Sequence, residues 1–309
     1  MASYVSRRLV QSAFVVWGAV TVTFLVVRLV PGDPAALLLG PFSTQADRAE
    51  LRAQLGLDRP FPMQYADYLG DVLHLDFGRS FRFGGDAMAL VLAAFPATLV
   101  LAAGAMVLTL LLSFPMGIVA ARRPSGLVDQ TISAVSLVGQ SLPQFWVGIM
   151  LVLVFAAGLG ILPSSGAGSV RSLILPAVAL ALPYVGWLAR LVRAGLIEEL
   201  GADYVRTARA KGLTEGVVFL FHALRNALVP VVTAAALVLG TFLGGAVIVE
   251  VVFAWPGVGK LLIDAISFRD YAVVQAAVVL IAVAYASLNL VVDLLYGYLD
   301  PRIRVTGDA

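Results

Sequence analysis

Long apolar runs separated by short polar segments make up most of the chain. Six of these runs approach or exceed the roughly 20 apolar residues that a helix needs to cross the hydrocarbon core of a bilayer. The fourth run is short and contains Pro176 and Pro183, so we expect a kinked helix that neighbouring helices bury. The pattern predicts an all-α integral membrane protein with six transmembrane helices, at Leu9–Val30, Ala97–Ala121, Ile132–Leu159, Leu173–Ala189, Ala227–Val249 and Ala272–Tyr298.

Residues 31–96 form a polar interruption between the first two predicted spans. The stretch "STQADRAELRAQLG" predicts an amphipathic helix that Ser43 or Thr44 caps and that ends at Gly56. The stretch "PMQYADYLGDVLHL" predicts a second helix. Two interpretations of this helical cap stay open, namely a loop packed on the bilayer surface and a docking surface for an external partner.

Composition supports the membrane assignment and narrows the chemistry. The chain is 60% hydrophobic and 13% charged, whereas soluble domains carry about 25% charged residues. Cysteine is absent, and His74 and His222 are the two histidines. The net charge is +2, and the basic residues are scattered at the ends of apolar runs instead of clustering on one face. This placement argues against a nucleic-acid partner.

Basic residues indicate how the chain is oriented. If the predicted spans alternate in direction, twelve Lys and Arg side chains fall on one side, which the positive-inside rule identifies as the cytoplasm. Both termini are therefore predicted to be cytoplasmic. The twelve residues are Arg7, Arg8, Arg122, Arg123, Arg190, Arg193, Arg206, Arg209, Lys211, Arg225, Arg302 and Arg304.

Catalytic and nucleotide-binding motifs are not apparent. The segment "WPGVGKLL" at 255–262 superficially resembles a phosphate loop, but the required earlier glycine is missing and Leu261 replaces the Ser or Thr that would bind magnesium. We therefore predict a non-catalytic chain that binds no cofactor and hydrolyses no ATP by itself.

An ion-coupled carrier is the main alternative on residues alone, because such carriers place ionisable groups near the middle of the membrane. Glu250 and Asp293 both fall near the ends of predicted spans. Asp293 and Asn289 would either line a polar pathway or form an interfacial pair in which a neighbouring cation satisfies the carboxylate. The motif Gly240-x-x-x-Gly244, followed by Gly245, predicts close helix packing, and a second membrane subunit is plausible because six spans make a thin wall for a polar pathway.

One cytoplasmic segment of about 194–226 is unusually polar. Its stretch "DYVRTARAKGL" predicts a short amphipathic helix that Gly212 closes in a left-handed conformation. Tyr204 and Ala208 would share one side with Gly212, while Arg206, Arg209 and Lys211 project elsewhere. The two-sided pattern favours a protein-docking element over a simple loop.

The same segment resembles the cytoplasmic EAA-type loop of ATP-binding-cassette (ABC) importer permeases, in the variant of the dipeptide and oligopeptide branch. Aligned on Gly212, the Glu-Ala-Ala of the general pattern corresponds to Arg206, Thr207 and Ala208, so this chain departs from that pattern as the peptide branch does. Further stretches resemble the branch in order: "RLVPGDPA" at 28–35, "LGLDRPFPMQY" at 55–65, "DFGRSF" at 76–81, "LPQFWVGI" at 142–149, "VVFAWPGVGKLL" at 251–262, "RDYAVVQ" at 269–275 and "VDLLYGYLDPRIR" at 292–304.

The resemblance implies a type I ABC importer permease in a bacterial plasma membrane. Its expected parts are a cytoplasmic N-terminus and first span (1–30), an extracytoplasmic segment (31–96), a five-helix core (97–299) and a cytoplasmic tail (300–309). It implies three kinds of protein partner: a homologous permease, two ATP-binding domains that use ATP and Mg, and an extracytoplasmic solute-binding protein. Peptides are the expected solute, with nickel chelates, glutathione or haem as alternatives.

The resemblance also assigns candidate sites. Coupling to the ATPase is expected at Asp203, Tyr204, Arg206, Thr207, Ala208, Arg209, Lys211 and Gly212, with Tyr204, Ala208 and Gly212 forming the buried contact. Docking of the binding protein is expected at Asp67, Tyr68, Trp255, Pro256, Gly257 and Lys260.

Overall fold

The computed structural model describes residues 2–29, 44–54 and 56–299. The predicted tail at 300–309, the start of the predicted cap at 31–43 and the possible helix cap Ser43 lie outside these residues. Within them the regular elements are helical, in the order α1 (Ala2–Leu29), α3 (Gln45–Gln54), α4 (Phe61–His74), α5 (Ala87–Arg122), α6 (Leu127–Ser141), α7 (Gln144–Leu151), η1 (Val152–Gly158), α8 (Val170–Leu200), α9 (Asp203–Ala210), α10 (Glu215–Val217), η2 (Val218–Leu224), α11 (Arg225–Val252), α12 (Val258–Ser267) and α13 (Tyr271–Leu299).

Five helical stretches in the described residues are long and apolar enough to cross a membrane. They are Val5–Leu29, Ala87–Arg122, Val170–Leu200, Glu215–Val252 and Tyr271–Leu294. The third predicted span is wrong as a single straight helix, because α6 and the α7–η1 stretch meet at an angle of 102°. The break falls at Leu142, whose backbone is extended (φ −82°, ψ 131°) in front of Pro143, as expected from the clash between a proline ring and a preceding helical residue.

Helix α8 occupies the centre of the helical body, although its sequence makes the shortest predicted span. It extends over 31 residues in spite of Pro176 and Pro183, and a capping box between Ser169 and Ser172 starts it. Its buried positions are more frequent than those of the other candidate spans. The prediction of a protein-buried fourth helix is therefore confirmed. The predicted span was shorter than the observed helix.

Two glycines allow the helices beside α8 to approach it closely. A methyl group on Gly117 of α5 would lie 2.6 Å from the carbonyl oxygen of Ala189. A methyl group on Gly186 of α8 would lie 2.5 Å from Cα of Ser136 in α6. Neither position has room for a side chain, so α5, α6 and α8 pack as one unit.

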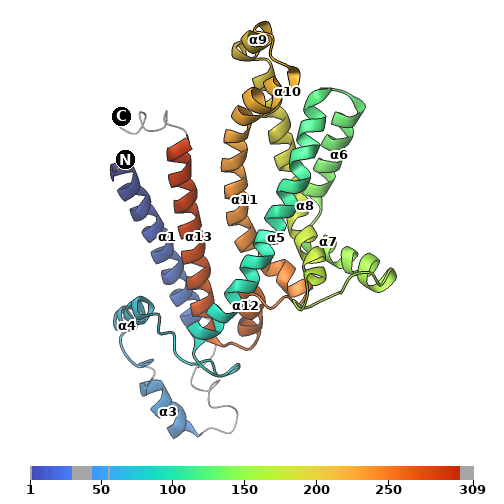
Figure 1. The fold of residues 1–309 in the computed structure, drawn as a ribbon. Coiled ribbons are helices and arrows are strands. Elements are labelled where there is room, and N and C mark those ends of the chain that lie inside the picture. Colours follow the sequence, from blue (N-terminus) through green and yellow to red (C-terminus); the bar gives the residue numbers. More distant parts are fainter. Residues whose placement is uncertain (1, 30–43, 55, 300–309) are drawn as a thin grey trace.

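Helices α1 and α13 lie side by side and form the other flank of the molecule (Figure 1). Phe24 of α1 is buried against aromatic rings of α4, with its ring centroid 5.4 Å from Tyr68 and 5.2 Å from Tyr65. This aromatic cluster attaches the predicted cap to the membrane-spanning flank.

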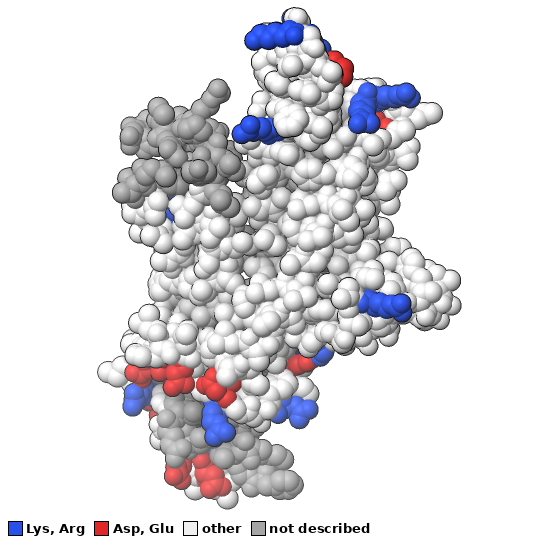
Figure 2. Space-filling model, in the orientation of Figure 1, with Lys and Arg blue, Asp and Glu red and all other residues white. Residues whose placement is uncertain are grey.

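The two ends of the helical body differ in the elements that they carry. We call them the α9 end, which also holds the start of α1, and the α3 end, which holds α3, α4 and α12 (Figure 1). At the α3 end the Thr44 hydroxyl accepts a hydrogen bond from the Asp47 backbone N–H at 3.2 Å, and the Asp47 carboxylate accepts one from the Thr44 N–H at 2.9 Å. Thr44 thus caps α3. Figure 2 shows charged side chains gathered at the two ends, with few between them.

Candidate functional site in the connection between α8 and α11

Helix α9 is the predicted amphipathic helix, and it projects beyond the spans at one end of the molecule (Figure 1). Its C-terminus is closed by a pair of backbone hydrogen bonds, from Gly212 N–H to the Arg209 carbonyl at 2.9 Å and from Leu213 N–H to the Ala208 carbonyl at 3.4 Å. This is the Schellman arrangement, which requires a left-handed residue at the turn. Gly212 has φ +84°, so the predicted left-handed turn is confirmed.

The apolar face of α9 is buried within the chain itself. Val205 and Ala208 pack against Val218 of η2 and are at most 5% exposed. Ala208 is thus covered by its own chain in this structure, and its contact with another protein together with Tyr204 and Gly212 stays a prediction. Residues three apart lie on the same face of a helix, and here that face covers the start of η2.

The hydroxyl of Tyr204 also points toward its own chain. It donates a hydrogen bond to the carboxylate of Glu199 at the end of α8 and accepts one from the amide nitrogen of Asn226 in α11 at 3.0 Å. It also lies 3.3 Å from the carbonyl oxygen of His222. Partial burial, together with the bond to Glu199, raises the pKa of Tyr204 above its usual value, so the hydroxyl keeps its proton.

The remaining candidate residues form an exposed polar face. Arg209 makes a two-point contact with the carboxylate of Glu215, with N–O distances of 2.7 and 3.2 Å. Arg206 lies 3.4 Å from Asp203, and both are exposed, as are Thr207, Lys211 and Gly212. Figure 2 shows basic side chains at this end of the molecule.

The six residues predicted to contact a binding protein differ in their solvent exposure. Asp67 and Pro256 are exposed and Lys260 is half-buried, whereas Tyr68, Trp255 and Gly257 are buried. These last three positions are covered by their own chain in this structure, and their contact with a binding protein stays a prediction. Burial raises the pKa of Tyr68 to about 12, and its ring belongs to the aromatic cluster around Phe24.

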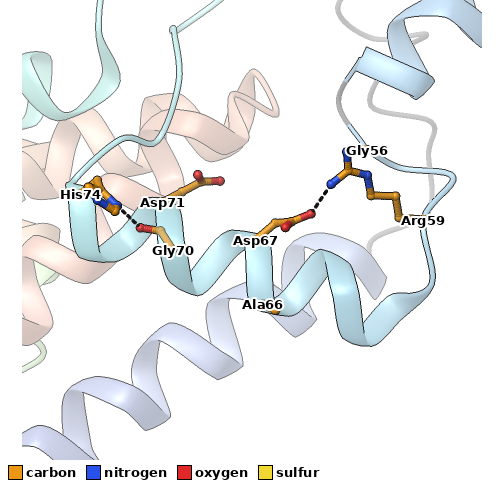
Figure 3. Close-up of a pocket in the computed structure, with 7 residues that line it drawn as sticks. All are labelled: Gly56, Arg59, Ala66, Asp67, Gly70, Asp71 and His74. Carbon is orange, nitrogen blue, oxygen red and sulfur yellow. Dashed lines mark hydrogen bonds and ion pairs between the residues drawn. The ribbon is translucent and has the colours of Figure 1, made fainter.

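Asp67 borders a groove of about 510 Å³ on one side of α4 (Figure 3). Its carboxylate accepts a hydrogen bond from Arg59 at 2.8 Å. Asp71 also lines the groove, and burial together with the nearby Asp76 and Asp67 carboxylates raises its pKa. Polar groups therefore face the solvent along the outer surface of the cap.

The "WPGVGK" segment leads into α12, and its backbone is hydrogen-bonded to the buried carboxylate of Glu250. The side chain of Glu250 accepts a hydrogen bond from the backbone N–H of Lys260 at 3.0 Å. A methyl group on Gly257 would lie 2.1 Å from Oε1 of Glu250. The Trp255 indole donates to the carbonyl of Ala97 in α5 at 2.8 Å. The segment is thus a structural corner, packed against α5 and the Glu250 carboxylate.

Asn289 and Asp293 lie on α13, but the structure gives them different surroundings. Asp293 forms an ion pair with Arg8 of α1 at 3.0 Å, which favours the interfacial interpretation of this carboxylate. Asn289 lies near Gly240 of α11, where its Oδ1 would be 3.6 Å from an added methyl group. Close packing at Gly240 involves side chains of α13, among them Tyr285.

Sequence comparison covers almost the whole chain. Residues 113–305 match the family described as binding-protein-dependent transport system inner membrane component, and residues 1–102 match the N-terminal part of such membrane components. The chain is 39% identical to the oligopeptide transport system permease protein AppB of Bacillus subtilis, over 98% of this chain and 100% of that protein. It is 40% identical to the di/tripeptide transport system permease protein DppB of Pseudomonas aeruginosa, over 98% and 99%.

Solved structures share the fold at lower sequence identity. An inward-facing form of the MetNI methionine ABC transporter matches with a TM-score of 0.58 and 21% identity, covering 69% of this chain and 97% of that one. An amino acid ABC transporter with histidines matches with a TM-score of 0.54 and 15% identity, covering 68% and 94%.

Proposed function

Because the chain belongs to the family of binding-protein-dependent transport system inner membrane components, we propose that it is a permease subunit of an ABC importer for di- and oligopeptides. The observation that carries this proposal is near-full-length similarity to permeases named for oligopeptides, di/tripeptides and D,D-dipeptides. The chain would form one part of the translocation pathway and leave ATP hydrolysis to other subunits.

The proposed assembly contains a second, homologous permease, two ATP-binding domains and an extracytoplasmic solute-binding protein. ATP and Mg are used by the ATP-binding domains. In this proposal the chain itself binds no nucleotide, and Leu261 in place of the Ser or Thr of a phosphate-binding loop supports this. The assembly lies in the plasma membrane with both termini of this chain in the cytoplasm, and the basic side chains of the α9 end support this orientation.

Helix α9 is the proposed coupling helix. Its exposed face offers Asp203, Arg206, Thr207 and Lys211 to a partner, while Val205 and Ala208 fasten it to η2. An ATP-binding domain that receives this face would displace α9 when it closes on ATP. The spans would follow as rigid bodies, which alternates access to the pathway between the two sides of the membrane.

The α3 end is the proposed docking surface for the binding protein. Asp67, Pro256 and Lys260 are the candidate contacts that remain accessible. The polar groove beside Asp67 (Figure 3) provides carboxylates that basic side chains of a partner can reach.

Uptake of radiolabelled di- and oligopeptides tests the proposal. A strain without this chain should lose uptake, and a plasmid copy should restore it only when the partner ATP-binding domains can hydrolyse ATP. Competition by unlabelled nickel chelate, glutathione or haem, with no competition by peptides, would assign a different solute. Uptake that survives loss of ATP hydrolysis and stops when the proton gradient is dissipated would instead show an ion-coupled carrier.

A further inference from the structure

Three elements of the α8–α11 connection meet at a single oxygen atom, the hydroxyl of Tyr204. The hydroxyl belongs to α9, its hydrogen-bond acceptor Glu199 belongs to the last turn of α8, and its donor Asn226 belongs to the first turn of α11. A phenolic hydroxyl has one hydrogen to donate and lone pairs to accept. Both capacities are used here, with partners on two different spans.

The other side-chain contacts described for α9 are with the segment that follows it, which continues into α11 as the single helical stretch Glu215–Val252. Val205 and Ala208 pack on Val218, and Arg209 pairs with Glu215 of α10. In the part of the chain that the structure describes, the Tyr204 hydroxyl provides the only side-chain hydrogen bonds that join α9 to α8 and to α11. Without it, the turn at Gly201 and Ala202 would connect α9 to α8 with no side-chain hydrogen bond beside it in the described residues.

We propose that Tyr204 is a positioning residue that fixes the coupling helix to the facing ends of α8 and α11, so that a displacement of α9 moves both spans together. This inference rests on the proposed function, because it assumes that an ATP-binding domain displaces α9. It differs from the sequence-based expectation, in which the Tyr204 side chain itself makes the contact with that domain.

The test uses the complete transporter in liposomes with its binding protein and a labelled peptide. Three quantities are measured: ATP-binding domains retained on purification, ATP hydrolysis, and peptides imported per ATP hydrolysed. Tyr204→Phe should retain the ATP-binding domains and hydrolyse ATP, but import about 2- to 10-fold fewer peptides per ATP, the range expected when one hydrogen-bonded link is lost. A loss of stability alone would lower import and hydrolysis together.

Two further variants make the test specific. Tyr285→Phe is the matched control, because Tyr285 on α13 is exposed to a similar degree (40% against 38%) and the described residues give its hydroxyl no hydrogen bond. Its peptide-to-ATP ratio should equal that of the unaltered protein. Asn226→Ala removes the α11 partner and leaves Tyr204 in place, so it should lower the ratio as well. The double variant should be little worse than Tyr204→Phe, since both changes break one network.

Several results would overturn the inference. One is a peptide-to-ATP ratio for Tyr204→Phe equal to that of the Tyr285→Phe control. If the Tyr204→Phe transporter fails to retain its ATP-binding domains on purification, the Tyr204 side chain instead contacts those domains. If Tyr204→Phe does not assemble, an unchanged ratio in Asn226→Ala rejects the inference. Failure of the proposed function is distinguishable, because the unaltered transporter would then import no peptide in response to ATP.

Discussion

The hydroxyl of Thr98 in α5 donates a hydrogen bond at 2.7 Å to the carboxylate of Glu250 in α11, and Glu250 is fully buried. The same hydroxyl accepts the backbone N–H of Val258 at 2.9 Å, at the start of α12. Glu250 also accepts the N–H of Lys260. These bonds join three helices around one carboxylate and satisfy backbone donors that the first turn of a helix leaves unpaired.

Replacing Glu250 should therefore destabilise the protein. Glu250→Gln substitutes an NH₂ group for one acceptor oxygen, so either the Thr98 hydroxyl or the Lys260 N–H loses its partner. An unsatisfied buried donor costs about 1–3 kcal/mol. Thermal denaturation of the purified transporter, followed by the loss of the monodisperse complex in size-exclusion chromatography, should begin at lower temperature than for the unaltered protein.

Thr98 offers a matched pair of variants for the same network. Thr98→Val removes the hydroxyl and should behave like Glu250→Gln, while Thr98→Ser keeps the hydroxyl and should retain most of the stability. Equal stability of the Val and Ser variants would contradict the role given to this hydrogen bond.

Close packing between α6 and α8 makes a second prediction. Gly186→Ala places a methyl group 2.5 Å from the Ser136 backbone, and overpacking of this kind costs about 1–3 kcal/mol. Gly244→Ala is the control, because an added methyl group there meets no atom within 4 Å. The amount of folded protein extracted from membranes should fall for the first variant and stay level for the second. A reversed order would show that α6 and α8 are less tightly packed than described.

Hydrophobic runs were sufficient to predict the helical spans, because length and apolar content decide which segments enter a bilayer. They were insufficient for the third span. There the apolar character continues across Pro143, so only the backbone effect of the proline could have revealed the break at Leu142. The extent of α8 was also missed, since its polar last turns lie among other helices.

Within the candidate site, local features were predictable and tertiary ones were not. The helix at "DYVRTARA" and the left-handed Gly212 follow from neighbouring residues. The burial of Ala208 depends on Val218 ten residues later, and the bond from Asn226 to Tyr204 depends on the return of the chain into α11. Glu250 was placed near a span end by sequence, but its partner Thr98 lies 152 residues away.

The left-handed turn at Gly212 gives a third prediction. Gly212→Trp introduces both a bulky side chain and a conformation that ordinary residues rarely adopt, and we expect it to abolish peptide uptake and solute-stimulated ATP hydrolysis while the chain still inserts in the membrane. Gly212→Asn should be milder, because asparagine tolerates left-handed backbone angles. Immunoblots of membranes check insertion. Normal uptake by the Trp variant would argue against coupling through this turn.

The solvent exposure of residues at the α3 end gives a fourth prediction. It can be tested by cysteine labelling, because the chain has no cysteine and an introduced one is its only thiol. Asp67→Cys and Pro256→Cys should react with a membrane-impermeant maleimide added from outside and should cross-link to the binding protein. Tyr68→Cys and Trp255→Cys, at buried positions, should react much more slowly. Ready labelling only from the cytoplasmic side would reverse the proposed orientation.

The absence of free space at Gly117 and Gly186 limits how this protein can change shape. Gly117 lies directly against the Ala189 carbonyl oxygen and the Val192 side chain of α8, and Gly186 lies directly against Cα of Ser136, so sliding of these helices would force atoms together. Shear of α8 against α5 and α6 is thereby opposed. Rotation of α5, α6 and α8 as a single block is the movement left to them, and its hinges have to lie in the connections outside that block.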